Sequence, residues 1–503
     1  MDTSGSLQGR AEAPASARAS FASFRSALSY SYIENYGSFV IGLVATIVIS
    51  RILGPAEIGA FSIGVGLVGV IAVIREMGVG AYIVQEESLT DGRIRAAFTI
   101  LVALGSGLGL AILGLSWPAG RLYGSEVARV VAILSLGFAI TPLGGVAQAL
   151  MARDLQFGRL SWIRFLHGFV AASVGIVLAS LGFGPEGLAW ASVASALSNA
   201  ALSTVAKPHR WRPNFSRREW KRIVGVGGPA AAASLVEDVA SALPELLLGR
   251  LQNLAAAGLF SRARGLSQTA TQAIAGAAGP VVLCEFALRN RGGVSLDPFY
   301  RKATLCVTAL GWSGLGVLAL LAEPAVRVLF GSQWTEVVPL VRWLCVAAAV
   351  ALLTAYSHQA LLASGGALAA MRARLAWLPI HFVCLLLGAL GGPDWIAAGM
   401  VLSSIAGSAL LCAALRRRIG IAVFAHLRIA KESAPIAFSA TIGALPSLLL
   451  GDGTLGGSIL VLLAGGVGAI AGFLAAARVT GHPVLEELIR MLGSLRARTR
   501  PGV

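Results

Sequence analysis

The sequence carries little charge. Only 13% of its 503 residues are charged and 56% are hydrophobic, whereas a soluble globular domain is about 25% charged. So much apolar surface with so few solubilising groups excludes a string of water-soluble domains. The sequence therefore predicts a polytopic membrane protein, whose apolar surface faces lipid.

Cysteine is scarce, and its spacing excludes two kinds of site. The five cysteines lie far apart inside apolar stretches and form no C-x-x-C pair. Disulfide frameworks and structural zinc sites need clustered cysteines, so we expect neither. The sequence also lacks a P-loop and other nucleotide-binding signatures. We therefore expect no metal, no cofactor, no catalytic residues and no intrinsic ATP hydrolysis.

Long apolar runs dominate what is present. A helix needs about 20 mostly apolar residues to cross a bilayer, and such runs occur about fourteen times. They cover residues 31–53, 58–81, 96–118, 127–150, 163–183, 187–206, 223–249, 256–283, 303–322, 337–363, 375–391, 395–415, 433–450 and 457–477. The predicted fold is therefore an all-α polytopic membrane protein with about 14 transmembrane helices.

The net charge of +16 has a membrane explanation. Of the 40 basic residues, 31 fall in the two tails and in alternate loops, and five fall in the other loops. Basic residues stay on the cytoplasmic side of a membrane, so this alternation predicts that both termini are cytoplasmic. It also accounts for the positive charge without nucleic acid.

The sequence contains an internal duplication. Residues 51–62 and 250–261 both fit R-[IL]-x6-G-x-F-S, and residues 148–152 (QALMA) resemble residues 359–363 (QALLA). Two further pairs, at 122 and 329 and at 184 and 392, lie at nearly the same offset. Each half holds an even number of predicted spans, so both halves insert the same way up. Transporters built from such parallel repeats place their site between the halves.

The duplication divides the chain into segments. We predict two parallel six-helix lobes and two extra helices outside the repeat. The segments are a cytoplasmic tail (1–30), an N-lobe (31–206), a basic inter-lobe loop (207–222), a C-lobe (223–415), the last two helices (433–477) and a cytoplasmic tail (478–503).

Several short blocks resemble one family of membrane proteins. They are residues 50–62 (SRILGPAEIGAFS), 76–85 (EMGVGAYIVQ), 149–157 (ALMARDLQF), 258–263 (GLFSRA) and 329–334 (LFGSQW). With them the chain resembles the Wzx-like oligosaccharide flippases, or polysaccharide exporters, of the multidrug/oligosaccharidyl-lipid/polysaccharide exporter superfamily, and most closely the subgroup for exopolysaccharide or colanic-acid-type repeats. The resemblance extends over residues 25–480.

This resemblance implies an alternating-access transporter of the bacterial inner membrane. Its substrate would be undecaprenyl-diphosphate-linked oligosaccharide, carried from the cytoplasmic to the periplasmic leaflet, and its partners a polysaccharide polymerase and a chain-length regulator. Two alternatives stay open. They are a drug/cation antiporter of the same superfamily and a membrane polysaccharide polymerase, which would need a long periplasmic loop.

Ionisable residues inside spans are candidates for the site, because charge in the membrane is costly. Arg264, Gln268 and Gln272 follow each other at four-residue spacing and so share a face of the span 256–283. That face suits phosphate and sugar. For Arg262, near the periplasmic end of the same span, we expect a structural role, and contact with phosphate or sugar is the alternative.

Two acids stand side by side in the span 223–249. Glu237 and Asp238 are candidates for coupling transport to a proton or sodium ion, since carboxylates are the groups that such ions require. The alternative is a buried ion pair with an arginine of the N-lobe.

The first two spans carry the remaining candidates. Arg75 is the candidate for a diphosphate contact on entry, because a guanidinium binds two phosphate oxygens at once. Asn35 is a candidate sugar contact, and Glu34 and Glu76 are candidate coupling groups. For Arg75 the alternative is a salt bridge with Glu34 or Glu76.

Overall fold

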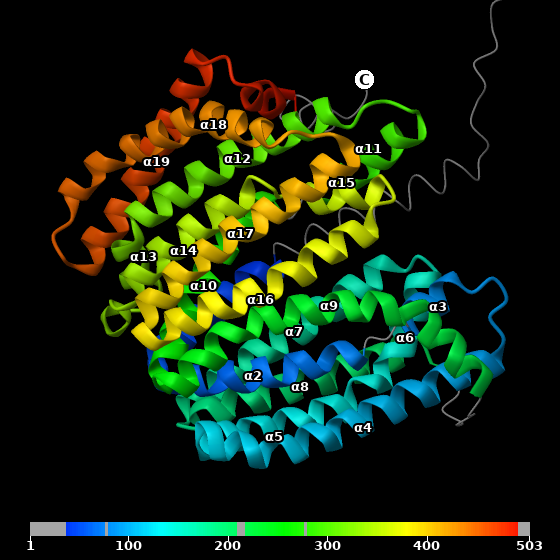
Figure 1. Cartoon of the computed structure of the whole chain (residues 1–503). Coiled ribbons are helices and arrows are strands. Elements are labelled where there is room, and N and C mark those ends of the chain that lie inside the picture. Colours follow the sequence, from blue (N-terminus) through cyan, green and yellow to red (C-terminus); the bar gives the residue numbers. More distant parts are fainter. Residues whose placement is uncertain (1–36, 76–78, 209–216, 276–278, 491–503) are drawn as a thin grey trace, which may run out of the picture.

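The computed structural model describes residues 37–75, 79–208, 217–275 and 279–490 (Figure 1). These residues form helices joined by short connections, and they contain no β-strand. The all-α fold expected from the apolar runs is therefore confirmed.

The first described helix is Gly37–Ile52. The helices that follow are α2 (Pro55–Arg75), α3 (Val79–Gln85), α4 (Asp91–Tyr123), α5 (Ser125–Ile140), α6 (Pro142–Arg153), α7 (Phe157–Ser180), α8 (Gly184–Ala206), α9 (Arg217–Leu251), α10 (Leu254–Ala275), α11 (Gly279–Arg291), α12 (Asp297–Leu320), α13 (Ala322–Leu329), η1 (Ser332–Trp334), α14 (Val337–Leu352), α15 (Ser357–Ala363), α16 (Ala367–Gly391), α17 (Pro393–Ile419), α18 (Val423–Ala444), η2 (Leu445–Leu450) and α19 (Leu455–Val479). A last helical segment covers residues 483–490.

Ten of these helices are long and apolar enough to cross a membrane, or eleven if the bent pair α5 and α6 is one span. The chain is thus a multi-pass membrane protein, and the count of fourteen stays a prediction. Three predicted spans do not meet this test. This test covers the described residues only: the described part of the first span is short, and the described parts of α9 and α10 do not pass it.

The structure corrects several predicted boundaries. The span 127–150 is bent by 47° between α5 and α6, where Pro142 lacks the N–H that a continuous helix needs. The predicted bounds of the span 337–363 are confirmed, although it consists of two helices, α14 and α15. Helix α16 begins at Ala367, eight residues before the apolar run that starts at 375. The intervening sequence is rich in Ala, Leu, Met and Arg, which are strong helix formers.

The helices pack mainly within each half of the chain. In the N-terminal half, α5 contacts α2, α4 and α8, and α7 packs on α8. In the C-terminal half, α17 contacts α14 and α16, and α12 packs on α14. The halves meet where α2 contacts α9 and α10. Figure 1 shows the blue and cyan helices together below the yellow and orange ones. The lobe boundaries themselves stay a prediction.

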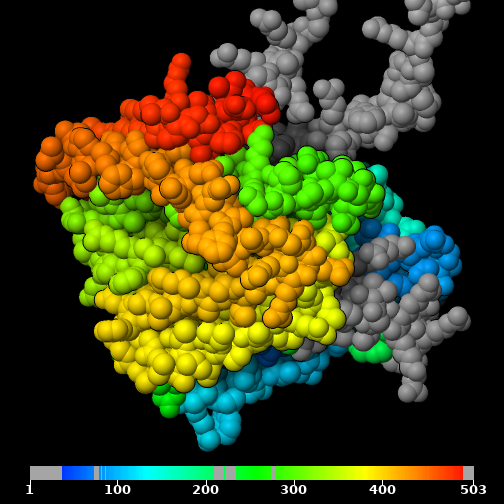
Figure 2. Space-filling model, turned by 45° about the horizontal axis from the view of Figure 1, so that its top comes forward, coloured from blue at the N-terminus to red at the C-terminus, as the bar shows by residue number. Residues whose placement is uncertain are grey.

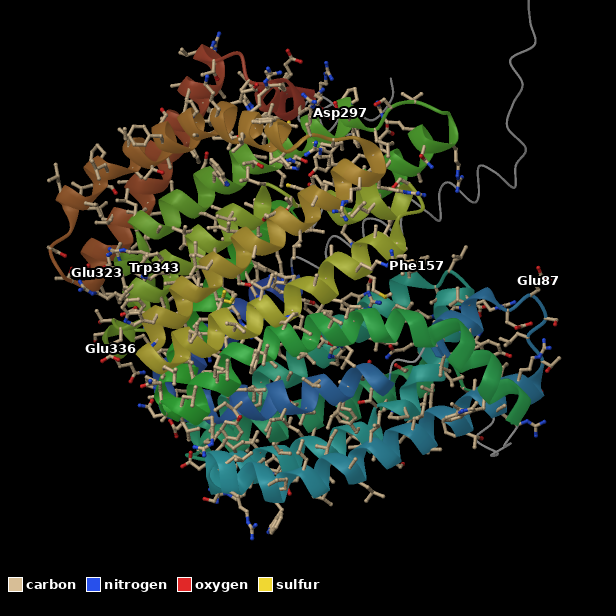
Figure 3. The ribbon with its side chains drawn as sticks, viewed as in Figure 1. Glu87, Phe157, Asp297, Glu323, Glu336 and Trp343 are labelled. Carbon is tan, nitrogen blue, oxygen red and sulfur yellow. The ribbon has the colours of Figure 1, made fainter. Side chains whose placement is uncertain are left out.

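Loops with many basic residues gather at one end of the bundle. Figure 3 labels Glu87 and Phe157, which flank two such loops, toward the right. Glu323 and Glu336, beside loops with few basic residues, lie at the left. We call the first end the basic end and the other the opposite end.

The C-terminal segment 483–490 packs onto the basic end. Figure 2 shows it in red beside the orange helices α18 and α19 and the green start of α12. Val484 is buried in a cluster with residues of α12, α18 and α19. The Lys302 ammonium also donates to the Glu487 carboxylate at 2.5 Å.

Candidate functional site

The two copies of the repeated R-[IL]-x6-G-x-F-S sequence lie against each other at the centre of the molecule. A β-carbon at Gly59 would lie 1.7 Å from the Leu254 carbonyl oxygen, and one at Gly258 would lie 1.9 Å from that of Pro55. Only glycine therefore allows α2 and α10 to cross this closely. The Ser62 hydroxyl donates to the Ser261 hydroxyl at 2.8 Å across the same crossing.

The halves are also joined toward the opposite end. The Arg51 guanidinium donates to the Val328 carbonyl at 2.6 Å. The Trp334 indole and the Gln333 amide both donate to the Ser50 carbonyl, at 2.7 and 2.8 Å. These contacts connect the end of the first described helix to the end of α13 and to η1, so they close the interface on that side.

Two cavities lie beside this crossing, with volumes of about 310 and 350 Å³. Both are lined by Gly42 and Thr46 of the first described helix and by Ser261 and Arg262 of α10. One of them extends between α7 and α8. The cavities thus lie between elements of the two halves of the chain, where a parallel-repeat transporter places its substrate.

Arg262 is the charged side chain that these cavities share. Its Nε is buried and has no hydrogen-bond partner, and the guanidinium forms no ion pair within the described part of the chain. The residue as a whole is only partly buried, but an unpaired charge inside a membrane span is costly, so this position calls for an anion or ordered water. A guanidinium suits a phosphate in particular, because it donates two parallel hydrogen bonds.

Arg264 is engaged within the C-terminal half. Its guanidinium lies 2.8 Å from the Glu245 carboxylate and also donates to the Ser241 carbonyl. The Glu245 side chain is only 3% exposed, and Arg264 is its one ion-pair partner among the described residues. Gln268 and Gln272, one and two turns further along α10, are exposed. The polar stripe expected on this helix is therefore present, but its arginine is already neutralised.

Glu237 also has a partner, which comes from α16. Its carboxylate pairs with Arg374, and the Glu237 side chain remains 52% exposed. His358 of α15 lies within electrostatic reach of both groups. Asp238 accepts a hydrogen bond from Ser241 through its backbone carbonyl, and its carboxylate forms no ion pair in the described ranges.

Four candidates cannot be placed. Glu34, Asn35 and Glu76 lie outside the described residues. Arg75 is the last residue of α2, and its side chain also lies outside the described part. Their roles stay predictions. No group of three or more His, Cys, Asp or Glu side chains that could hold a metal occurs in the described ranges.

The sequence did not predict the ion-pair partners of Glu237 and Glu245. Glu245 lies on the same face of α9 as Glu237, but nothing in its spacing points to Arg264 on the next helix. Arg374 directly precedes the apolar run that starts at 375, so the hydropathy pattern predicted that it lies in a loop. The helix-forming residues 367–374 are the signal that could have placed it inside a helix.

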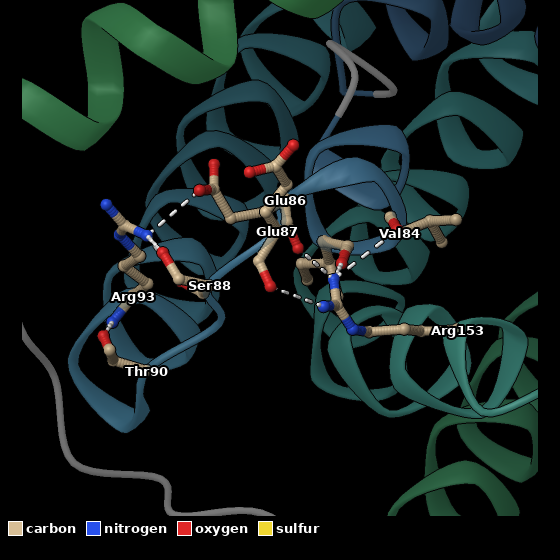
Figure 4. Close-up of polar contacts among 8 residues, drawn as sticks. Val84, Glu86, Glu87, Ser88, Thr90, Arg93 and Arg153 are labelled. Carbon is tan, nitrogen blue, oxygen red and sulfur yellow. Dashed lines mark hydrogen bonds and ion pairs between the residues drawn. The ribbon is translucent and has the colours of Figure 1, made fainter.

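Some basic residues used to infer orientation also hold the backbone at the basic end. Figure 4 shows Arg153, the last residue of α6, beside the segment that follows α3, where it donates to the Glu87 carbonyl at 3.4 Å. It also donates to the Ile83 carbonyl, within α3, at 2.7 Å. In the same close-up Arg93 pairs with Glu86 at 3.0 Å. Arg153 thereby satisfies carbonyls that the helix end leaves without partners.

The fold is that of a known class of membrane transporters. It is similar to the Lipid II flippase MurJ in its inward closed conformation, with a TM-score of 0.70 and 12% identity over 89% of this chain and 98% of that one. It is also similar to an inward-facing multidrug resistance MATE family transporter of the MOP superfamily, with a TM-score of 0.58 and 17% identity over 78% of this chain and 95% of that one.

Residues 48–339 match the family described as "Polysaccharide biosynthesis protein", and the chain belongs to this family. Among its relatives is the succinoglycan biosynthesis transport protein ExoT of Rhizobium meliloti (strain 1021), 25% identical over 62% of this chain. Another is the lipopolysaccharide biosynthesis protein WzxC of Escherichia coli (strain K12), 23% identical over 61% of this chain. The chain spans 63% of the length of each of these two relatives.

Proposed function

We propose that the protein is an alternating-access flippase of the bacterial inner membrane, with both termini in the cytoplasm. It carries undecaprenyl-diphosphate-linked oligosaccharide repeat units to the periplasmic leaflet for exopolysaccharide or lipopolysaccharide synthesis. Its family, the names of its relatives and its flippase-like fold support this proposal. A polysaccharide polymerase and a chain-length regulator are its proposed protein partners.

The observation that carries the proposal is the unpartnered Arg262 between the halves of the chain. A lipid-linked diphosphate cannot cross about 30 Å of hydrocarbon without cations to solvate it. Arg262 offers such a cation beside two cavities, and the exposed Gln268 and Gln272 on the same helix offer hydrogen bonds for sugar hydroxyls. Asn35 and Arg75 remain proposed contacts for the entering headgroup.

The charge at this position also favours an anionic substrate over a drug cation. Of the acids of α9, Glu237 and Glu245 are each paired with an arginine, and Asp238 lines neither cavity. The residue left without a partner at the shared cavity wall is a cation. A site built for a cationic drug needs the reverse arrangement, because like charges repel at close range.

Ion coupling is proposed at the acids of α9. Asp238 has no ion-pair partner in the described ranges, and Glu237 is half-exposed and shares its charge with Arg374. Protonation of Glu237 or Asp238 removes one negative charge near Arg374 of α16. Glu34 and Glu76 stay proposed coupling groups of the first two spans.

Proteoliposomes with a labelled undecaprenyl-diphosphate oligosaccharide test the proposal. We expect Arg262→Ala to slow flipping at least about tenfold, since a charge-assisted hydrogen bond contributes about 1.5–3 kcal/mol, and Arg262→Lys to retain part of the rate. Arg342→Ala is the matched control, because Arg342 is an exposed membrane arginine outside both cavities. Flipping by Arg262→Ala at the wild-type rate, with equal reconstitution, would contradict the assignment.

A further inference from the structure

A groove in the surface of the C-terminal half lies between α12, α14 and α18. Its volume is about 780 Å³, within the range of pockets that hold small molecules. Its walls are apolar and include Trp312, Leu315, Val346 and Phe438. Lys431 is the one charged residue among those that line it. An apolar groove with a single cation suits an amphipathic anion.

The sequence of α18 places charge and apolar surface in one line. Arg428, Lys431, Pro435 and Phe438 follow each other at spacings of three, four and three, so they share one face of the helix. All four are exposed. The two basic residues lie toward the basic end and the two apolar ones deeper in the membrane. Neither cation has an ion-pair partner among the described residues.

The backbone beside Lys431 is also unusual. Pro435 lies inside α18 and has no N–H, so it cannot donate to the Lys431 carbonyl four residues earlier. That carbonyl therefore lacks the donor that a continuous helix would supply. A hydroxyl of an anionic lipid headgroup could donate to it.

The length of the groove indicates which hydrocarbon fits it. On α18 the groove extends from Lys431 to Thr441, which at 1.5 Å per residue is about 15 Å. The hydrocarbon core of a bilayer is about 30 Å thick, so the groove has the depth of one leaflet. It shares no lining residue with the two cavities beside Arg262.

We propose that this groove binds one anionic glycerophospholipid from the leaflet at the basic end. The phosphate lies at Lys431 and Arg428, a headgroup hydroxyl donates to the Lys431 carbonyl, and an acyl chain packs along Pro435 and Phe438. The lipid would lie over α12, between α14 and α18, and α18 lies outside the duplicated region. This binding does not depend on the proposed flippase activity.

Native mass spectrometry of the full-length protein tests the site, with phosphatidylglycerol and phosphatidylcholine added to the delipidated protein. We expect one phosphatidylglycerol to bind more tightly than phosphatidylcholine. Lys431→Ala should weaken phosphatidylglycerol binding about fivefold, the effect of one basic residue near an anionic surface. Arg478→Ala is the matched control, because it removes the same charge from the end of the neighbouring α19.

A second variant tests the acyl-chain part of the site. Ala434 is exposed and lines the groove, so Ala434→Trp fills the space and leaves Lys431 in place. We expect it to reduce phosphatidylglycerol binding while the protein keeps its size-exclusion profile. Equal binding by Lys431→Ala and Arg478→Ala would overturn the proposal. Displacement of phosphatidylglycerol by undecaprenyl phosphate at equal concentration would also overturn it, because the groove would then hold a polyprenyl chain.

Discussion

A charge inside a membrane span costs several kcal/mol unless a partner, water or a ligand solvates it. Glu237, Glu245 and Arg264 each meet this requirement with an ion pair inside the C-terminal half. Arg262 does not, and it is also the charged residue that both cavities share. Two arginines on one helix thus differ in their surroundings, so their substitution should have different consequences.

For the pair of Glu245 and Arg264 we predict a structural role. Glu245→Gln leaves Arg264 without its counter-charge and should lower the free energy of unfolding by about 3 kcal/mol. This is the lower end of the range for a broken buried pair, and we expect it because the Arg264 side chain is still 25% exposed. Thermal unfolding of the purified protein measures this. Glu323→Gln, which breaks an exposed pair with Arg327, should cost less than about 1 kcal/mol.

The double variant Glu245→Leu/Arg264→Met provides the control for this prediction. It removes both charges together, so it should recover most of the stability lost in Glu245→Gln. A Glu245→Gln protein that unfolds at the wild-type temperature would show that the pair contributes nothing to the fold.

At the scale of helices, α2 and α10 form the central contact between the two halves. Their crossing relies on Gly59 and Gly258, which occupy equivalent places in the repeated sequence. A contact between equivalent residues is what a two-fold relation between two lobes produces at its axis. Movement between the halves must therefore change the contacts around this crossing.

We predict that cross-linking this crossing stops transport. The Ser62 and Ser261 hydroxyls are 2.8 Å apart, so Ser62→Cys/Ser261→Cys brings two sulfur atoms within bonding reach. Under oxidation the double variant should lose flipping in proteoliposomes and regain it with a reductant. Each single variant should be unaffected by oxidation. Full transport by the cross-linked protein would show that α2 and α10 do not separate.

A third prediction concerns the C-terminal segment 483–490 and pH. The hydrogen bond from Lys302 holds the pKa of Glu487 below its usual value, which is about 4.3. A lowered pKa stabilises the docked segment at pH values above the unfolded pKa, and this contribution is lost as the pH falls through the lowered value. The segment should therefore stay docked at pH values where an ordinary glutamate is already protonating.

A spin label at the exposed Ile489 measures this docking. In Lys302→Ala the label should already be more mobile than in the wild type at neutral pH, and its mobility should change less as the pH falls, because the Glu487 pKa then differs less between the docked and undocked segment. Glu486→Gln is the control, since Glu486 is exposed and contacts only Arg490 at 3.7 Å among the described ion pairs. Identical pH profiles for Lys302→Ala and the wild type would contradict the prediction.

The elements show what the sequence could and could not predict. Long apolar runs predicted the helices, because lipid forces each span to satisfy its own backbone. The bend at Pro142 was missed, since hydropathy does not report the N–H that proline lacks. The early start of α16 was missed, since hydropathy does not report helix that continues beyond the apolar region. The repeated motif G-x-F-S predicted that residues 51–62 and 250–261 occupy equivalent places in the two halves. That the two copies touch each other at Gly59 and Gly258 depends on how the halves pack, which the motif does not encode.

The same limit applied to the site. Sequence spacing grouped Arg264, Gln268 and Gln272 on one helix face, and they do lie on α10. It could not distinguish Arg264 from Arg262, because the partner that neutralises Arg264 comes from α9. Pairing between helices is set by tertiary packing, which one sequence does not reveal.

For the molecule as a whole, the described charges and the fold lead to a prediction about the driving force. A diphosphate headgroup that leaves a negative cytoplasm gains about 2.3 kcal/mol per charge per 100 mV. The charge that crosses the membrane is then that of the headgroup, provided that Arg262 itself moves little. Flipping in proteoliposomes should accelerate when an imposed potential makes the loading side negative, and it should slow when the potential is reversed. The measurement uses a potassium gradient with valinomycin at constant pH, and Arg342→Ala should respond like the wild type. Transport that ignores both the potential and imposed proton or sodium gradients would contradict charge-driven flipping and ion coupling at Glu237 and Asp238 together.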